Sequence, residues 1–177
     1  LNFQVLRSTE DLVCNIAGVR NLSAQKCDTP WMVILDMDTL IDKTMAAQLL
    51  DLTYNNEEKV AYKFNRKVEN PKHPKHNQMH PAVTLIRNKD YWDVGGCEED
   101  LVGSYGQTDP CFWYRAKNKI KIKECKNIYL NYLPYGESKI NRDLRRNIKI
   151  FNNKKMNNNW STDFVRFNWT WLLNNQV

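Results

Sequence analysis

The sequence has few cysteines, glycines and prolines. It contains five cysteines, an odd number, and no two of them are separated by two residues. Zinc ribbons, redox pairs and disulfide scaffolds are therefore not expected, and we predict reduced, mostly buried thiols in a cytoplasmic compartment. Six glycines and six prolines among 177 residues exclude collagen-like and linker-like chains.

Long apolar runs are also missing. The longest is the five-residue segment 31–35, Trp-Met-Val-Ile-Leu, which is far too short to cross a bilayer, so no membrane span is expected. The first residues show no basic stretch followed by an apolar one, and a secretory leader is not expected either. The chain is nevertheless 42% hydrophobic and 11% aromatic, which is enough for a folded core.

Basic residues outnumber acidic residues, 26 against 20, which gives a formal net charge of +6. The excess gathers in residues 117–123 and 142–155. Such a balance favours a polyanionic partner or an anionic substrate such as a nucleotide. A solvated surface is the simpler interpretation of the basic runs, and a nucleic-acid-binding module is the less favoured alternative.

Apolar patterns alternate between short strands and helices in the first half of the chain. Asp42 is the expected N-cap of one helix, and Asp109, before Pro110, that of another. The lysine and isoleucine alternation of 119–123 is typical of an edge strand. The expected strands are 3–7, 31–35 (buried and parallel), 60–64, 82–87, 119–123 and 129–133, and the expected helices are 15–27, 44–54 and 110–117.

This order of elements predicts an α/β protein with a mixed, mainly parallel central sheet and helices on both faces. In such a sheet a ligand site is expected at the carboxyl ends of the strands. Residues 1–138 are expected to form this single Rossmann-like domain. Residues 139–177 are expected to be a basic, Asn-rich extension that packs on it.

Asp36-Met37-Asp38 follows the apolar strand 31–35 directly, at the position where such a site is expected. Residues two apart on an extended chain point the same way, so both carboxylates can face one ligand. Two oxygen ligands of this kind suit Mn²⁺ or Mg²⁺ held together with substrate phosphates. An acidic turn that caps the next helix is the alternative interpretation.

Residues 34–42, Ile-Leu-Asp-Met-Asp-Thr-Leu-Ile-Asp, resemble the first motif of haloacid-dehalogenase-like phosphatases, in which the first Asp accepts the phosphoryl group. That family has a glycine between the second Asp and Thr-Leu, and a later Gly-Asp followed by a further Asp. Neither feature is found in this sequence. A phosphatase that acts through Asp36 therefore stays an alternative.

A second family accounts for more of the chain. Arg20-Asn21, Ala24 and the strand with its two aspartates resemble the middle of a GT-A-fold glycosyltransferase of the family-two type. Residues 88–115 resemble its acceptor-side segment: a bulky residue before Gly-Gly, an acidic patch, Tyr-Gly-x-x-Asp, and a helix with Arg six residues after that Asp. The Asn-, Lys- and Ile-rich composition also resembles the glycosyltransferases that chlorella viruses carry for their capsid glycans, which would place the protein in a host cytoplasm.

The resemblance implies an inverting transferase that moves a sugar from a nucleotide-diphospho donor, with a UDP-sugar favoured, to a hydroxyl of a glycan or glycoprotein acceptor. A Mn²⁺ or Mg²⁺ ion on Asp36 and Asp38 would neutralise the leaving diphosphate, and Asp109 would act as the general base. We expect donor contacts from Arg20, Met37 and Arg87, and acceptor contacts from Glu98, Glu99, Asp100, Trp92 and Trp113. For the charged residues the alternative is a solvated surface, and for the tryptophans it is buried packing.

Residues 66–81 hold three histidines and three prolines without periodicity, which predicts a loop. Metal binding by His73, His76 and His80 would need an unbroken helix, so a loop that closes over donor or acceptor is favoured. Two features of the family are missing: the opening unit that holds the nucleotide base, and a histidine after the helix as third metal ligand. The chain is therefore expected to begin inside the domain or to build its nucleotide pocket differently. Glu137 is a candidate substitute for the missing third metal ligand.

Overall fold

The computed structural model describes residues 4–55, 57–133 and 141–174. The chain divides into two compact units. Unit 1 comprises residues 1–26, 97–111 and 140–177, and unit 2 comprises residues 27–96 and 112–139.

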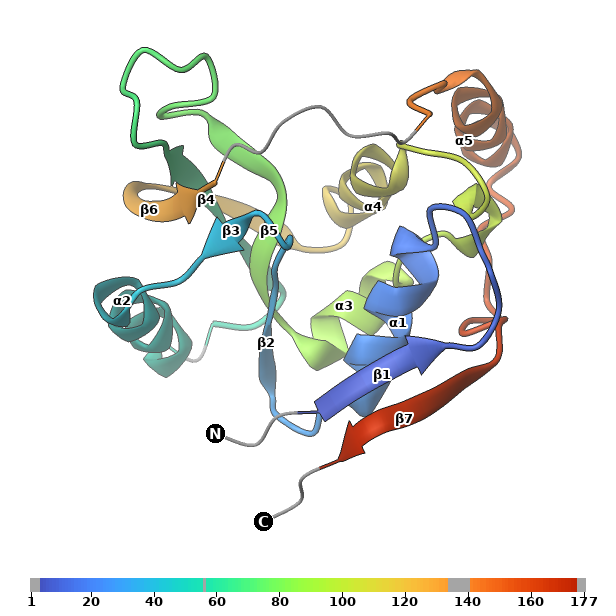
Figure 1. Cartoon of the computed structure of the whole chain (residues 1–177), viewed down its shortest axis with the longest axis horizontal. Helices are drawn as coiled ribbons and strands as arrows, with labels where there is room; N and C mark the ends of the chain where they lie inside the picture. The colour runs from blue at the N-terminus through green and yellow to red at the C-terminus, as the bar shows by residue number, and fades with distance from the viewer. Residues whose placement is uncertain (1–3, 56, 134–140, 175–177) are drawn as a thin grey trace. The chain divides into compact units, whose positions relative to one another are not determined.

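A five-stranded sheet forms the body of unit 2, in the order β2-β5-β4-β6-β3 (Figure 1). Its strands are β2 (Trp31–Ile34), β3 (Thr39–Leu40), β4 (Val60–Lys67), β5 (Met79–Arg87) and β6 (Lys121–Tyr132). Only the β4–β6 pairing is parallel among the described residues, and the other three are antiparallel. The sheet is mixed, as predicted, but the prediction of a mainly parallel sheet is wrong. The reason is that β4 connects to β5 without a crossover helix, and such neighbours pair antiparallel.

Three strands of this sheet nevertheless run in the same direction. β2 and β4 are both antiparallel to β5, so they are parallel to each other, with helix α2 (Lys43–Tyr54) as the connection between them. β6 runs parallel to β4. The carboxyl ends of β2, β4 and β6 therefore share one edge of the sheet, where an α/β fold places its ligands.

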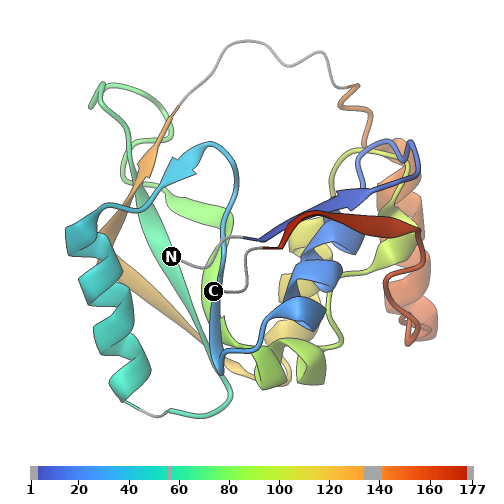
Figure 2. The ribbon, with the colours of Figure 1, turned by 60° about the horizontal axis from the view of Figure 1, so that its bottom comes forward.

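Helices lie on both faces of this sheet, as predicted: α2 on one face and α3 (Asn88–Val94) on the other (Figure 1 and Figure 2). α2 begins as expected, because the Asp42 carboxylate accepts the Met45 N–H at 2.9 Å. That bond, together with one from the Asn131 amide, lowers the pKa of Asp42. The core under α2 consists of Met45, Leu49, Val60, Tyr62, Phe64, Val83, Leu85, Ile128 and Leu130.

Four predicted elements differ from the structure. The predicted strands 119–123 and 129–133 belong to one strand, β6, which begins at Lys121 and ends at Tyr132. β3 pairs with β6 only at Asn131 and Tyr132, so within the described residues the segment 121–123 has only β4 beside it and lies at the sheet edge, as predicted. β2 is not a buried parallel strand, since it pairs only with β5 in the described part of the sheet, antiparallel, and is half-buried. Helix α4 (Thr108–Ala116) starts two residues before Pro110, so Asp109 lies in its first turn. Proline is tolerated there because first-turn N–H groups have no partner within the helix.

Unit 1 joins the two ends of the chain. Its elements are β1 (Gln4–Ser8), α1 (Ile16–Lys26), the short helix η1 (Glu99–Leu101), α5 (Arg145–Asn157) and β7 (Trp169–Asn174). β1 and β7 pair antiparallel, from Gln4 opposite Asn174 to Ser8 opposite Trp169 (Figure 1). The predicted boundary at residue 138 lies outside the described residues. The described part of the predicted extension supplies α5 and β7 to unit 1.

Buried side chains attach this extension to residues 97–111. Asn147 is fully buried, and its amide donates to the carbonyls of Leu101 at 3.0 Å, Ser104 at 2.9 Å and Gly106 at 2.9 Å. All five cysteines are free, as expected. Two of them are buried and three are half-buried, so the burial of the thiols is less complete than predicted.

The Gly95-Gly96 turn of unit 2 receives a buried arginine. Arg115, on α4, donates to the carbonyls of Gly95 at 2.9 Å and Gly96 at 2.5 Å. Gly95 has a φ of +103°, and a Cβ placed on it would lie 3.0 Å from the Arg115 guanidinium. The hydrogen bonds from Arg115 to the two glycine carbonyls therefore give the Gly-Gly and arginine motif a structural role within unit 2.

We expect Gly95→Ala to lower the free energy of unfolding by about 1–3 kcal/mol, because strain at a positive φ adds to crowding against Arg115. Urea denaturation measures the loss. Gly103→Ala is the matched control, since its φ is +95° and nothing lies within 4 Å of the new methyl group. The control should lose less, and equal losses would show that the approach of Arg115 contributes nothing.

Candidate functional site

Two acidic side chains and a histidine meet at the carboxyl edge of the unit 2 sheet. Asp36 and Asp38 follow β2, and His80 stands near the start of β5, which begins at the same edge. One carboxylate oxygen from each aspartate and one ring nitrogen of His80 lie within 4.8 Å of one another. The fold thus brings the two predicted metal ligands together and adds a third side chain to them.

The chain turns sharply from β2 into β3 at the two aspartates. The Asp36 carbonyl accepts the Thr39 N–H at 3.1 Å, and the Asp38 carbonyl accepts the Leu133 N–H at 2.8 Å. Both aspartates are half-buried, whereas the Met37 side chain between them is fully exposed. Residues 36–39 form a turn and not an extended strand, so the alternation expected from the sequence does not apply, and the turn itself brings the two carboxylates together. A donor contact by Met37 stays a prediction.

His80 is 3% exposed and is held from both sides of its ring. Nδ1 accepts the N–H groups of Ala82 at 3.2 Å and Val83 at 3.1 Å. Nε2 lies 3.5 Å from the Thr39 hydroxyl oxygen, and that hydroxyl donates to Asp38 Oδ1 at 3.3 Å. One nitrogen of the ring is therefore bound to the backbone, and the other faces the turn that carries Asp38.

The prediction of one loop over residues 66–81 is correct only in its middle, because β4 extends to Lys67 and β5 starts at Met79. The start of β5 was not predicted because Pro81 is an unusual residue inside a strand. Pro81 lies where the β4–β5 register shifts, and prolines occur in sheets at such irregularities. Among the described residues, His73 and His76 take no part in a metal-binding group with His80.

Two cations stand at the same edge as the aspartates, and the sequence pattern did not indicate either of them. Arg66, near the end of β4, is 8% exposed and donates to the Gln78 carbonyl at 3.4 Å. Burial lowers the pKa of the Arg66 guanidinium, and the charge of Asp38 acts against that shift. Lys75 donates to the Tyr132 hydroxyl at 2.6 Å, and its ammonium lies 4.6 Å from the centre of that ring.

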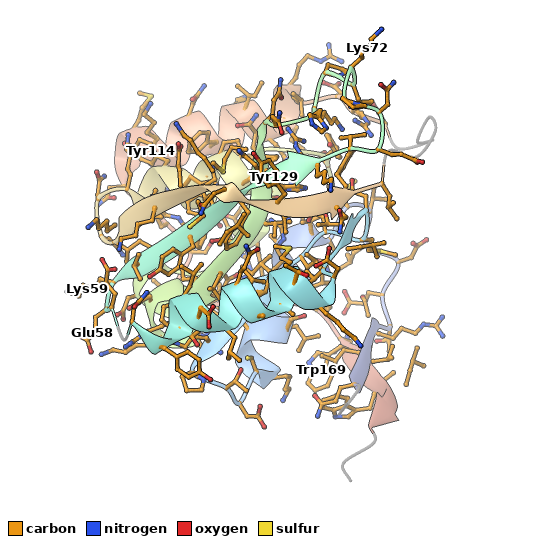
Figure 3. The ribbon with its side chains drawn as sticks, turned by 90° about the vertical axis from the view of Figure 1, so that its left-hand side faces the viewer. Glu58, Lys59, Lys72, Tyr114, Tyr129 and Trp169 are labelled. Atoms are coloured by element: carbon orange, nitrogen blue, oxygen red, sulfur yellow. The ribbon has the colours of Figure 1, made fainter. Side chains whose placement is uncertain are left out.

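The loop that carries Lys75 projects beyond the sheet. Figure 3 shows Lys72 at its tip, at the opposite end of β4 from Glu58 and Lys59, which stand where that strand begins. The loop therefore belongs to the edge with the two aspartates. This position is compatible with the predicted closing role, which stays a prediction.

In unit 1, α1 and the first turn of α4 bring Arg20 and Asp109 together. The guanidinium NH1 lies 2.6 Å from Asp109 Oδ1, and the two side chains are 12% and 29% exposed. Asp109 thus keeps part of its carboxylate accessible to solvent while Arg20 orients it. The two residues were expected at the site in separate roles, and this ion pair was not expected.

The acidic segment 98–100 is held by the C-terminal part of unit 1. Glu98 is fully buried and accepts the Ser161 N–H at 3.0 Å. Glu99 is 6% exposed and accepts the N–H groups of Val165 at 2.7 Å and Arg166 at 3.0 Å. Burial against the chain itself argues against the predicted acceptor contacts of Glu98 and Glu99 and assigns them to packing of the extension.

Asp100 is half-buried and lies 2.7 Å from both Lys154 and Arg166. Burial acts to raise the pKa of Asp100, but the hydrogen bonds from these two cations outweigh it and lower the pKa. The acceptor contact predicted for Asp100 would have to compete with both ion pairs. A structural role accounts for the contacts seen.

Arg87 ends β5 at the far edge of the sheet from His80. It stands in register with Trp31, the first residue of β2, whereas Asp36 follows the last. Its guanidinium lies 5.1 Å from the centre of the Trp31 ring. The structure therefore does not bring Arg87 to the aspartates, and the donor contact predicted for it stays a prediction.

The two candidate tryptophans occupy different positions in unit 2. Trp92 lies in α3, which begins where β5 ends, and its ring packs edge-on against Tyr91 at 5.2 Å. Trp113 donates its indole N–H to the Pro81 carbonyl at 2.7 Å, directly beside His80. Of the two, only Trp113 is connected to the edge that carries the aspartates, and its acceptor role stays a prediction. Glu137, the substitute metal ligand, lies outside the described residues.

Comparison with known proteins gives no match to a protein-family model and no match to a curated protein. The resemblance to family-two glycosyltransferases therefore rests on the motifs of this chain. The fold of unit 2 is mixed α/β and is compatible with a Rossmann-like architecture. No helix in the described part of the chain is long and apolar enough to cross a membrane.

Proposed function

We propose that the protein is a metal-dependent inverting glycosyltransferase that moves a sugar from a nucleotide-diphospho donor, with a UDP-sugar favoured, to a hydroxyl of a glycan acceptor. The observation that carries the proposal is the pair of half-buried carboxylates, Asp36 and Asp38, at the carboxyl edge of the unit 2 sheet. Two carboxylate oxygens fit Mn²⁺ or Mg²⁺, which keep their other positions for water and substrate phosphates. The motifs of residues 88–115 support the same family.

The charges at that edge suit a diphosphate. When bound, the ion would act as a Lewis acid on the negative charge of the leaving group. Arg66 adds a guanidinium held in place by burial and by Gln78. Lys75 adds an ammonium on the projecting loop, where Tyr132 holds it. Cations of this kind bind phosphate oxygens by charge-assisted hydrogen bonds.

Transfer with inversion needs a base for the acceptor hydroxyl. As the hydroxyl oxygen bonds to the anomeric carbon, the bond from that carbon to the diphosphate breaks, and the hydroxyl proton passes to the Asp109 carboxylate. Arg20 orients this carboxylate through the ion pair at 2.6 Å. We further propose that the ring of Trp113 offers a stacking surface to a sugar.

Calorimetric titration of UDP and of a panel of UDP- and GDP-sugars, each with and without Mn²⁺, tests the proposal. We expect one nucleotide class to bind more tightly with Mn²⁺. Asp38→Ala should reduce its affinity to the level measured without the metal, because it removes one of two ligands. Asp51→Ala, an exposed change on α2, is the control and should behave as the wild type. Failure of every nucleotide to bind the folded protein, or an affinity that Mn²⁺ does not change, would contradict the proposal.

A further inference from the structure

We infer that His80 is a positioning residue that holds Asp38 through the hydroxyl of Thr39, and that it is not a third metal ligand. The inference deepens the proposed function and rests on it for the metal. His80 and Thr39 are each 3% exposed, so their contacts form inside the protein and not in solvent.

The direction of each hydrogen bond follows from the chemistry of the atoms. Backbone N–H groups can only donate, so His80 Nδ1, which meets those of Ala82 and Val83 at 3.2 Å and 3.1 Å, must offer a lone pair. A neutral imidazole carries one proton, which therefore stands on Nε2. A protonated ring nitrogen has no lone pair for a metal.

The Nε2–H proton leads toward Asp38. Nε2 lies 3.5 Å from Thr39 Oγ1, which accepts from it, and the Thr39 hydroxyl donates its own proton to Asp38 Oδ1 at 3.3 Å. In this series of hydrogen bonds every donor points in the same direction, from the backbone of β5 toward the Asp38 carboxylate. This series of hydrogen bonds orients Oδ1 of Asp38 and does not involve its other carboxylate oxygen.

The local sequence explains why the backbone meets the ring in this way. Pro81 has no N–H, so the donors that reach Nδ1 come from the next two residues. These residues lie where the β4–β5 register shifts, between Asn65 opposite Met79 and Lys63 opposite Thr84. The register shift at Pro81 thus also places the two N–H groups that hold the His80 ring.

Distance alone would also allow His80 as a third ligand, since its ring nitrogen lies within 4.8 Å of both carboxylates. Histidines bound to metals almost always donate the proton of their other nitrogen to a carbonyl or carboxylate. Here the other nitrogen meets two donors. Metal binding through Nε2 would place a third N–H against them and remove two hydrogen bonds. The two backbone N–H donors at Nδ1 therefore favour the positioning role over metal ligation.

Nitrogen NMR of ¹⁵N-histidine-labelled protein tests the tautomer directly. The His80 signals are assigned by their loss in His80→Gln. We expect the Nε2–H tautomer in the protein alone and with saturating Mg²⁺ and UDP, a diamagnetic pair that permits the measurement. A proton on Nδ1, or loss of the Nε2 proton when Mg²⁺ is added, would overturn the inference. The measurement without metal does not depend on the proposed function.

Mn²⁺ affinity, followed by electron paramagnetic resonance of the free ion, separates the two roles of His80. We expect Thr39→Val and His80→Leu each to weaken Mn²⁺ binding by about 10–100-fold, as changes to groups that support metal ligands do. The double variant should bind as weakly as either single variant, because both interrupt one chain. Thr39→Ser, which keeps the hydroxyl, should bind as the wild type, and circular dichroism checks that all four fold.

An unchanged affinity in Thr39→Val beside a large loss in His80→Leu would show direct ligation and overturn the inference. A wild-type protein that binds no Mn²⁺ at all would remove the proposed function. The tautomer measured without metal would still confirm or refute the hydrogen-bond chain, so the two failures are distinguishable.

Discussion

Replacement of Asp109 by asparagine is expected to lower the rate of sugar transfer by about 10²–10⁴-fold, the contribution of a positioned base. Asparagine has nearly the shape of aspartate and keeps one oxygen for Arg20, but it cannot take a proton from the acceptor hydroxyl. The loss should therefore appear in the rate of transfer and not in donor binding. Initial rates with the donor identified by titration, at saturating acceptor, measure it.

Two controls make this result specific. Metal-dependent donor affinity of Asp109→Asn should equal that of the wild type, since the proposed metal ligands are unchanged. Asp163→Asn, an exposed aspartate of unit 1, should transfer sugar at the wild-type rate. Normal transfer by the Asp109→Asn protein would refute the assignment of the base while leaving the metal site untouched.

The second large effect concerns stability. Lys154→Met is expected to lower the free energy of unfolding by about 3–5 kcal/mol, because it leaves a buried carboxylate without its cation. Glu98 is fully buried, and Lys154, with a side chain 8% exposed, lies 3.4 Å from it and 2.7 Å from Asp100. Methionine keeps most of the volume, so the loss reports charge and not a cavity. Urea denaturation measures the change.

An exposed ion pair supplies the matched control. Lys126 lies 3.9 Å from Glu124, with side chains 76% and 54% exposed, and Lys126→Met should change the free energy of unfolding by about 0–1 kcal/mol. Adding Glu98→Gln to Lys154→Met should recover part of the stability, because it removes the unpaired charge. A loss in Lys154→Met no larger than in the control would show that the buried pair does not hold the extension.

Local patterns predicted the elements whose signals lie within a few residues. The Asp42 cap and the apolar spacing after it placed α2 to within one residue. The position of Asp36 and Asp38 at a strand end followed from one apolar run before an acidic turn. Such features depend on neighbours in the sequence, and a single sequence contains them.

Pairings between distant segments could not be predicted in the same way. β5 carries His80 to the aspartates only because it pairs with both β2 and β4, and nothing near His80 in the sequence indicates those partners. Glu98 looked like a surface carboxylate because its partners, Ser161 and Lys154, lie more than fifty residues away. The choice of β6 as the partner of β4 likewise depends on contacts between distant segments.

Anomalous diffraction at the manganese edge, from crystals grown with Mn²⁺ and UDP, tests the proposed metal site most directly. We predict a manganese peak bound by Asp36 and Asp38 and by oxygens of the diphosphate, with His80 outside the ligand set. A peak at other residues, or UDP bound away from these two aspartates, would contradict the proposed site.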